Sequence, residues 1–427
     1  LEGLANRAGF IFTAMGGALV APIGLAAKAS IDFESAFAGV RKTVDASEAE
    51  FSALREQFLD MSTTIPTTAS ELAKIGEMAG QLGIKKDNIA GFTRTIADLG
   101  ETTNLTGEAG ASMLAKFANI TQMDKSLFSN LGSSIVALGN NSAATEQDIA
   151  SMALRLAAGG EIAGMTEGDI LGIATALASV GIEAEAGGSA FSRVFMQMQQ
   201  AAMTNTAELA LYEKTLKMTT PQLKAFAAEM GLTVKELKEQ SKGVLESGAQ
   251  LRGFADVAGM TAEQFATAFK DRPAQAVDAF VQGLARIRAS GGDVYRTLAM
   301  LGIEEIRMRD ALLRSATAGD ILAKSITLGN TAFQENNALT DEAAKRYETT
   351  AAKLDILWNN VVRLSISVGD VLLPGIIKFT EVMIPVVQGI AAWTDAHPGL
   401  TTAVVALAGG LGSLSLAVGT LSFLFSG

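Results

Sequence analysis

The sequence predicts an all-α protein of many short helices, with an apolar segment at each end. No stretch alternates apolar and polar residues between turn signals, so strands are not indicated. Helix-start pairs and helix-ending glycines recur at helical spacing through the middle of the chain. The 427 residues carry only two charges in residues 1–27 and none in residues 396–427. The pattern therefore predicts a folded helical middle between two ends that can leave water.

The N-terminal apolar segment covers 20 uncharged residues between Arg7 and Lys28. A helix of that length spans about 30 Å, which is the thickness of a bilayer core. The Gly16-Gly17 pair also allows a buried hairpin, and the flanking Arg7 allows a signal peptide. We expect residues 1–30 to form a hairpin or a membrane-competent helix. Because the chain starts at Leu1, we also expect it to be part of a longer protein.

The C-terminal apolar segment, residues 369–427, has a candidate transmembrane stretch at residues 403–425. This stretch carries no charge, and its only polar side chains are Ser and Thr. Its glycines would let helix backbones approach closely in lipid. The candidate membrane-inserting residues are Val405, Leu407, Leu414, Leu416, Val418, Leu421 and Phe423.

Helix starts in the middle of the chain are marked by Thr followed three residues later by Glu, Asp or Gln. The hydroxyl can accept from the third backbone N–H, while the acidic or amide side chain reaches back to the first. The five pairs are Thr68/Glu71, Thr145/Asp148, Thr166/Asp169, Thr233/Glu236 and Thr261/Gln264. Pro221 marks a further start, because a helix needs no N–H in its first turn.

Helix ends are marked by an apolar residue followed by Gly, which adopts the left-handed conformation that closes a helix. The predicted closing glycines are Gly83, Gly100, Gly139, Gly181, Gly231, Gly302 and Gly329. Between starts and stops lie helices of about 10–20 residues, a usual length in globular proteins. Residues 170–182 are uncharged but too short to span a bilayer, so we expect them to form a core helix.

Two longer helices with heptad-like stripes are also predicted. The first stripe consists of Val44, Phe51, Leu54, Phe58 and Met61. The second consists of Tyr347, Ala351, Leu354, Trp358 and Val361, and is our candidate self-association seam. Spacing of this kind suits a coiled coil between copies, and it equally suits a helix packed on its own domain.

These features predict five regions. Residues 1–30 are the apolar N-terminal segment, residues 31–205 a helical core, and residues 206–290 a charged helical insertion. Residues 291–368 continue the core with a long helix, and residues 369–427 are the apolar C-terminal segment.

The composition excludes most site chemistry. The absence of Cys excludes disulfides and thiolate sites, and a single His, His397, excludes multi-histidine metal sites. A net charge of −11 argues against sequence-specific nucleic acid binding. We therefore predict no catalytic residue, no metal site and no cofactor, and expect the protein not to be an enzyme.

One succession of segments resembles a known family. GFADVAGMTAEQFATAFKD is followed by LGIEEIRMRDALLRSA, then FQENNALTDEAAKRYE, then GDVLLP, all within residues 253–374. Upstream, IDFESAFAGVRKTVD (31–45) and two helical units at 68–84 and 144–160 extend the likeness. In this order, the segments resemble the core region of phage tail tape measure proteins, over essentially the whole chain.

The resemblance implies a structural protein that lies inside the tail tube of a long-tailed phage and sets tail length during assembly. It implies other copies of the chain as partners, in a trimer or hexamer, together with tail tube, tail-tip and chaperone proteins. On infection, the resemblance implies ejection and a channel for DNA through the host inner membrane. The expected locations are thus the virion and, during ejection, that membrane.

Two other classes of protein share some of these features. A helical pore-forming protein unrelated to tails would also have apolar ends. A carboxylate-dependent cell-wall hydrolase would need no Cys or His, although no acidic pair in this sequence is placed to favour it.

Overall fold

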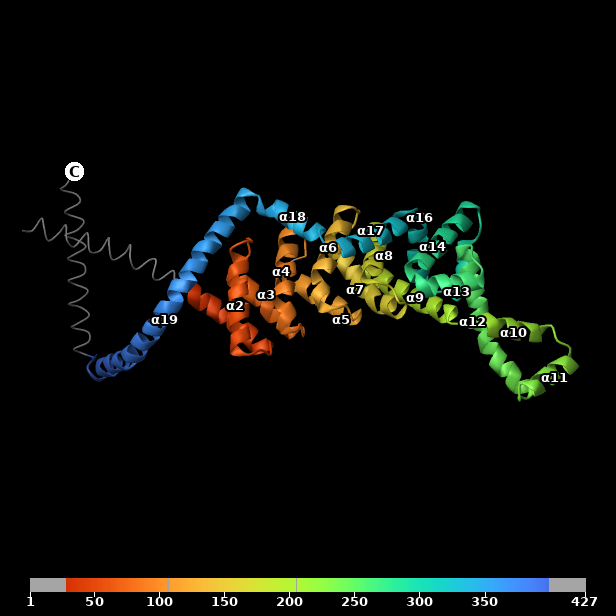
Figure 1. Cartoon of the computed structure of the whole chain (residues 1–427), viewed down its shortest axis with the longest axis horizontal. Coiled ribbons are helices and arrows are strands. Elements are labelled where there is room, and N and C mark those ends of the chain that lie inside the picture. Colours follow the sequence, from red (N-terminus) through yellow and green to blue (C-terminus); the bar gives the residue numbers. More distant parts are fainter. Residues whose placement is uncertain (1–27, 106, 205, 399–427) are drawn as a thin grey trace, which may run out of the picture. The chain divides into compact units, whose positions relative to one another are not determined.

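A computed structural model describes residues 28–105, 107–204 and 206–398 (Figure 1). These residues are helical with short links and contain no strand, which confirms the all-α prediction. Residues 8–27 and 403–425 lie outside the described ranges, as do all seven candidate membrane-inserting residues. Among the described helices, none combines the length and apolar character needed to cross a bilayer.

Residues 28–43 form the first helix. The α-helices that follow in the first half are α2 (Glu48–Ser62), α3 (Ala69–Gln81), α4 (Lys86–Thr102), α5 (Gly107–Ile120), α6 (Phe128–Asn140), α7 (Glu146–Ile162), α8 (Glu167–Ser179) and α9 (Ser189–Ala202). The second half contains α10 (Thr206–Leu216), α11 (Thr220–Glu229), α12 (Val234–Ala258), α13 (Ala262–Asp271), α14 (Pro273–Ala289), α15 (Val294–Met300), α16 (Ile306–Thr317), α17 (Ile321–Glu335), α18 (Ala338–Tyr347) and α19 (Thr350–Ala396). A short 3-10 helix (Lys125–Leu127) and a π-helical turn (Ala184–Gly188) complete the described elements.

The chain divides into two compact units. The larger is Phe33–Asn360, and the smaller combines Leu1–Asp32 with Val361–Gly427. Within the described part of the smaller unit, the Ser30 hydroxyl donates to a carboxylate oxygen of Asp370 at 2.6 Å. The five regions drawn from the sequence stay predictions.

All five predicted helix starts are confirmed as reciprocal capping boxes. At the start of α12, the backbone N–H of Thr233 donates to Glu236 at 2.8 Å, and the N–H of Glu236 donates to the Thr233 hydroxyl at 3.2 Å. Each box satisfies two N–H groups that have no partner within the helix.

Of the predicted helix ends, four are confirmed and three are wrong. Glycines 83, 181, 231 and 302 have φ between 70° and 78° and follow the last turn of a helix. Gly100, Gly139 and Gly329 instead lie inside α4, α6 and α17. At Gly329 the reason is packing, since a Cβ there would lie 2.5 Å from the carbonyl oxygen of Gly168.

The first heptad-like stripe serves the core of the larger unit. It does not lie on one long helix, because Val44 follows the first helix and α2 begins at Glu48. Phe51 and Phe58 are buried, with ring centroids 6.4 and 6.2 Å from that of Phe37. The prediction of a core helix at residues 170–182 is also confirmed, since α8 is buried on nearly every side.

The last helices of the larger unit return along the first ones. α17 packs on α8 and α6, and α18 packs on α6 and α4 (Figure 1). The Ser134 hydroxyl donates to the carbonyl of Gly329 at 2.9 Å, and an Asn130 amide N–H donates to that of Phe333 at 2.7 Å. These contacts join residues about 200 positions apart, so the C-terminal part of this unit closes over its N-terminal part.

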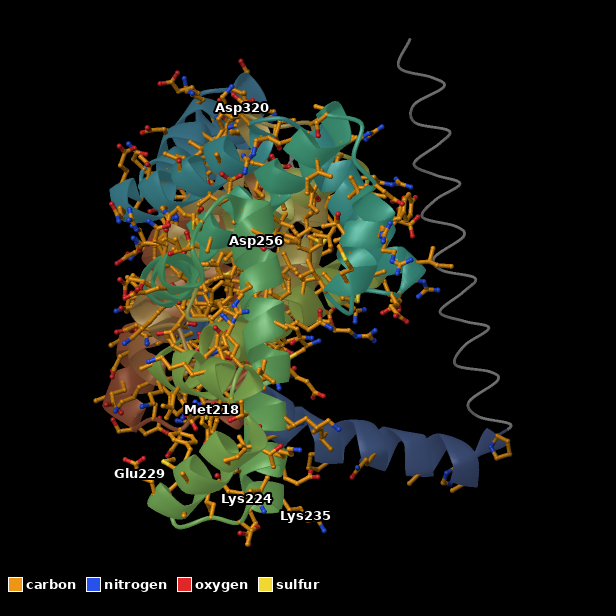
Figure 2. The ribbon with its side chains drawn as sticks, turned by 90° about the vertical axis from the view of Figure 1, so that its right-hand side faces the viewer. Met218, Lys224, Glu229, Lys235, Asp256 and Asp320 are labelled. Atoms are coloured by element: carbon orange, nitrogen blue, oxygen red, sulfur yellow. The ribbon has the colours of Figure 1, made fainter. Side chains whose placement is uncertain are left out.

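A small separate core lies in the predicted insertion. Tyr212 of α10, Ala227 of α11 and Leu237 of α12 are buried against one another. The surrounding surface is charged, and Figure 2 shows Lys224, Glu229 and Lys235 together at this end of the larger unit. The three helices therefore form a satellite bundle carried by α12.

Candidate functional site

The junction of α18 and α19 is the candidate site, because four of the five predicted seam residues lie on α19 and the fifth ends α18. Two buried polar side chains anchor this region to neighbouring parts of the chain and so determine which of its residues stay exposed. The first is Asn359, which is 2% exposed. Its side-chain amide lies within hydrogen-bonding distance of three carbonyls in the α2–α3 link, those of Ile65, Pro66 and Thr67, at 3.1, 2.8 and 3.2 Å. The first turns of α19 are thus held against the α2–α3 link of the larger unit.

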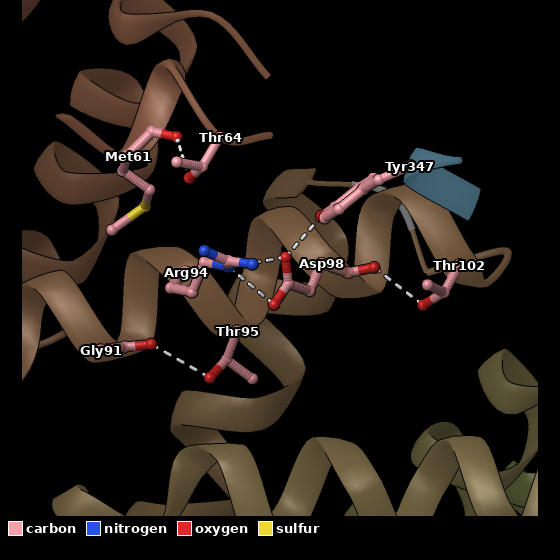
Figure 3. A network of polar contacts seen from close by, with 8 residues as sticks. All are labelled: Met61, Thr64, Gly91, Arg94, Thr95, Asp98, Thr102 and Tyr347. Atoms are coloured by element: carbon pink, nitrogen blue, oxygen red, sulfur yellow. Dashed lines mark hydrogen bonds and ion pairs between the residues drawn. The ribbon is translucent and has the colours of Figure 1, made fainter. Parts of the chain in front are cut away.

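The second anchor is Asp98 of α4, which is 5% exposed (Figure 3). The Arg94 Nε lies 2.8 Å from both of its carboxylate oxygens, and the Tyr347 hydroxyl donates to Oδ1 at 2.5 Å. A buried carboxylate needs partners of this kind, since an unpaired charge in the interior is costly. Burial, reinforced by the Asp98 charge, raises the pKa of the Tyr347 hydroxyl far above its usual range.

The structure therefore separates Tyr347 from the other predicted seam residues. Its side chain is half-buried against α4, whereas Ala351, Leu354, Trp358 and Val361 are exposed on α19. Leu354 and Trp358 expose 60% and 53% of their surface. The structure brings these four together on one helix, and their role in self-association stays a prediction.

Sequence reasoning missed a longer stripe on the same helix. We define the α19 stripe as six exposed apolar residues at alternating spacings of three and four: Leu354, Leu357, Val361, Leu364, Val368 and Val371. The apolar spacing of this stripe is visible in the sequence. The predicted seam started at Tyr347, and its spacing therefore included Trp358 in place of Leu357. The stripe ends just before Pro374, which lies inside α19 and lacks the N–H for a helical hydrogen bond.

The opposite face of α19 is buried. Ala352, Asn359 and Ile366 recur every seven residues and are 8%, 2% and 1% exposed. In the larger unit, α19 thus buries Ala352 and Asn359 and exposes Leu354 and Leu357. In the smaller unit, it buries Ile366 and exposes Leu364 and Val368. Within the described ranges, no group of three or more His, Asp or Glu side chains could hold a metal ion. The exposed apolar residues of α19 therefore form a surface suited to packing against another apolar surface.

Comparison with known proteins assigns the family. The family model for phage-related minor tail proteins matches residues 55–271, which is half of the chain. The chain belongs to the phage-related minor tail protein family. No curated protein and no solved structure was found to match it.

This minor tail protein is accordingly a structural component of the phage tail, and its place is in the virion. The matched range runs from α2 to α13 and includes Asp98 and the α2–α3 link, which hold Tyr347 and Asn359. The α19 stripe lies outside the matched range. Tail proteins work by association with other tail components, so exposed apolar surfaces are the features to examine for contact sites.

Proposed function

We propose that this minor tail protein is the core region of a tape measure protein, which sets tail length while tail tube subunits assemble around it. Membership of the minor tail family and the succession of segments from residue 253 onwards support the proposal. The chain would lie inside the tail tube in several copies, as a trimer or hexamer. Its other partners would be the tail tube protein, the tail-tip proteins and the assembly chaperones.

The observation that carries the proposal is the α19 stripe. Six exposed aliphatic side chains over 18 residues of helix form a band about 26 Å long. A band with this period winds around an identical band in a left-handed coiled coil and so removes its side chains from water. Such a contact would hold together the copies of a tape measure protein that lie in one tube.

The folded state bears on how the chain would measure length. A single helix of 427 residues would reach roughly 640 Å, at 1.5 Å per residue. The helices described above instead double back on one another, as α17 does on α8. We propose that this region is a folded body at one end of the tail and that the ruling length lies in flanking sequence.

The apolar ends suit a second task. During infection the chain would leave the tube, and residues 1–30 and 369–427 would enter the host inner membrane to form a path for DNA. The uncharged stretch at 403–425 supports this step by composition. A Leu414→Arg variant would then assemble tails but deliver DNA poorly, and normal plating efficiency of that variant would refute the membrane role.

Tail length tests the main proposal. An in-frame deletion of one helical block in the complete gene is expected to change tail length or block assembly, as judged by electron microscopy of particles. Tails of unchanged length with normal infectivity would contradict a measuring role for this region.

Self-association tests the α19 stripe directly. The double variant Leu357→Asp, Leu364→Asp should be a monomer by light scattering under conditions in which the wild-type chain is an oligomer. Ser367→Asp is the matched control, because it adds a carboxylate to an exposed position of α19 outside the stripe. A monomeric wild-type chain, or an oligomeric double variant, would exclude the stripe as the seam.

A further inference from the structure

The segment from α11 to α13 contains an internal duplication. Residues 222–242 align with residues 250–270 at an offset of 28, with seven identical residues in 21 positions. The identical pairs are Gln222/Gln250, Leu223/Leu251, Phe226/Phe254, Ala227/Ala255, Gly231/Gly259, Thr233/Thr261 and Lys242/Lys270. We call residues 220–243 the first copy and residues 248–271 the second copy. The end of the first copy and the start of the second share α12.

The two copies fold in the same way, as helix, glycine, threonine cap and helix. Gly231 and Gly259 have φ of 70° and 75°, and each precedes a Thr that caps the next helix. The closing hydrogen bonds also match. Leu232 N–H donates to the carbonyl of Ala227, and Met260 N–H donates to that of Ala255, both at 2.9 Å. The surroundings of each residue in the first copy can therefore be compared with those of its counterpart in the second copy.

In the second copy, the face of the first helix is covered by α14. Phe280 packs edge-on against Phe254, with ring centroids 5.4 Å apart. At Gly283 the two backbones touch, because a Cβ there would lie 1.8 Å from the Val257 carbonyl oxygen. Three residues later, the Arg286 guanidinium donates to the carbonyls of Val257 and Ala258 at 3.4 and 3.3 Å. An aromatic residue, a glycine and a cation at intervals of three thus cover this helix end.

In the first copy, no described helix takes the place of α14. Leu223 and Phe226 pack on one side against the satellite core and stay only partly buried, and Met230, the counterpart of Ala258, is 42% exposed. Among the described helices, none packs on α11 as α14 packs on the second copy. We call Leu223, Phe226, Glu229 and Met230 the first-copy face. Three of these residues are apolar and recur at helical spacing, so they lie along one side of α11.

The negative charge of Glu229 on this face complements the positive charge that Arg286 gives to α14. Glu229 is exposed and stands where the second copy has Val257, one of the two residues whose carbonyls accept from Arg286. A carboxylate beside carbonyls at a helix C-terminus attracts a cation more strongly than the carbonyls alone. Figure 2 shows Glu229 projecting outward at the end of the bundle, away from Asp256 of the second copy.

We propose that the first-copy face docks an amphipathic helix of a partner protein that carries the α14 pattern, with Phe, Gly and Arg at intervals of three. A second copy of this chain cannot supply it without unfolding, since its own Phe280 and Gly283 are buried. The partner is therefore another protein's helix, recognised by close backbone approach at the glycine and by the cation at Glu229. The inference is independent of the tape measure proposal.

The probe for this site is a fluorescent peptide with the α14 sequence, residues 272–290, added to the full chain. We expect saturable binding by fluorescence anisotropy, with a Kd on the order of micromolar. Glu229→Arg, which changes an exposed residue, should weaken binding about tenfold. Glu239→Arg is the matched control on the exposed surface of α12 and should leave binding unchanged. A peptide with Gly283→Leu should not bind.

Two outcomes would overturn the proposal. One is the absence of saturable binding to the wild-type chain. The other is binding that Glu229→Arg and Met230→Asp both leave unchanged, because the peptide would then be displacing α14 from the second copy. Circular dichroism of each variant shows whether the satellite bundle has kept its helices.

Discussion

The hydroxyl of Tyr347 donates to Oδ1 of Asp98 at 2.5 Å and so ties the end of α18 to α4 across 249 positions of sequence. We predict that Tyr347→Phe lowers the free energy of unfolding by about 1–3 kcal/mol, the range for a hydrogen bond to a charged group. The ring would still fill its site, while Asp98 would keep only the Arg94 contact. Chemical denaturation of the full chain measures the loss.

Tyr295→Phe provides the control for this prediction. Its side chain is 58% exposed on α15, so removal of that hydroxyl should change the free energy of unfolding by less than about 0.5 kcal/mol. Equal effects of the two substitutions would show that the Tyr347–Asp98 bond does not stabilise the fold.

Asn359 is predicted to hold the first turns of α19. Asn359→Ala removes the side-chain N–H groups that face the carbonyls of Ile65, Pro66 and Thr67, and should cost about 1–3 kcal/mol. Hydrogen exchange of residues 350–360 should accelerate, because this part of α19 loses its link to the α2–α3 segment. Lys353→Ala, at an exposed position in the first turns of α19, should change neither quantity appreciably. Unaltered exchange in the Asn359 variant would contradict the anchoring role.

Close helix contact predicts opposite effects at two helical glycines. A Cβ at Gly172 of α8 would lie 2.5 Å from the Cα of Ile326, so Gly172→Ala must push two backbones apart. We expect a loss of at least about 1–3 kcal/mol. At Gly91 of α4 nothing lies within 4 Å of the added Cβ, and Gly91→Ala should stabilise the protein by about 0.5–1 kcal/mol. Thermal unfolding of both variants tests the pair, and a stable Gly172→Ala protein would refute the contact.

The features that could be predicted from the sequence are those whose partners lie within a few residues. Thr233 and Glu236 close their capping box within one turn, so the pattern alone identifies the start of α12. Gly231 and Gly329 both follow an apolar residue, yet only Gly231 ends a helix. The role of Gly329 depends on Gly168, which is 161 positions away and has no signature in the local sequence.

The candidate site shows the same limit. Apolar spacing pointed to α19, but it began the stripe at Tyr347, whose hydroxyl donates to Asp98 of α4. That hydrogen bond could not be predicted from spacing, and neither could the burial of the Asn359 side chain against the α2–α3 link. The internal duplication was accessible to sequence comparison, although its open face becomes evident only when α14 is seen on the second copy.

Acidity should modulate stability through Asp278 of α14. Its Oδ1 is buried without a hydrogen-bond partner among the described residues, and burial raises the pKa of this carboxyl. The folded state therefore disfavours the charged form, and this penalty is fully present at neutral pH. It disappears as the pH falls through the raised pKa towards the ordinary carboxyl value near 4.

Asp278→Asn should consequently raise the unfolding temperature at pH 7, because the amide carries no charge to desolvate. The difference between variant and wild type should shrink as the pH is lowered and vanish below about pH 4. Asp271→Asn, at an exposed position of α13, is the matched control and should show no such convergence. Calorimetry over this pH range measures the difference. A wild-type protein that exceeds the Asp278 variant in stability at pH 7 would show that the buried carboxylate is compensated in the fold.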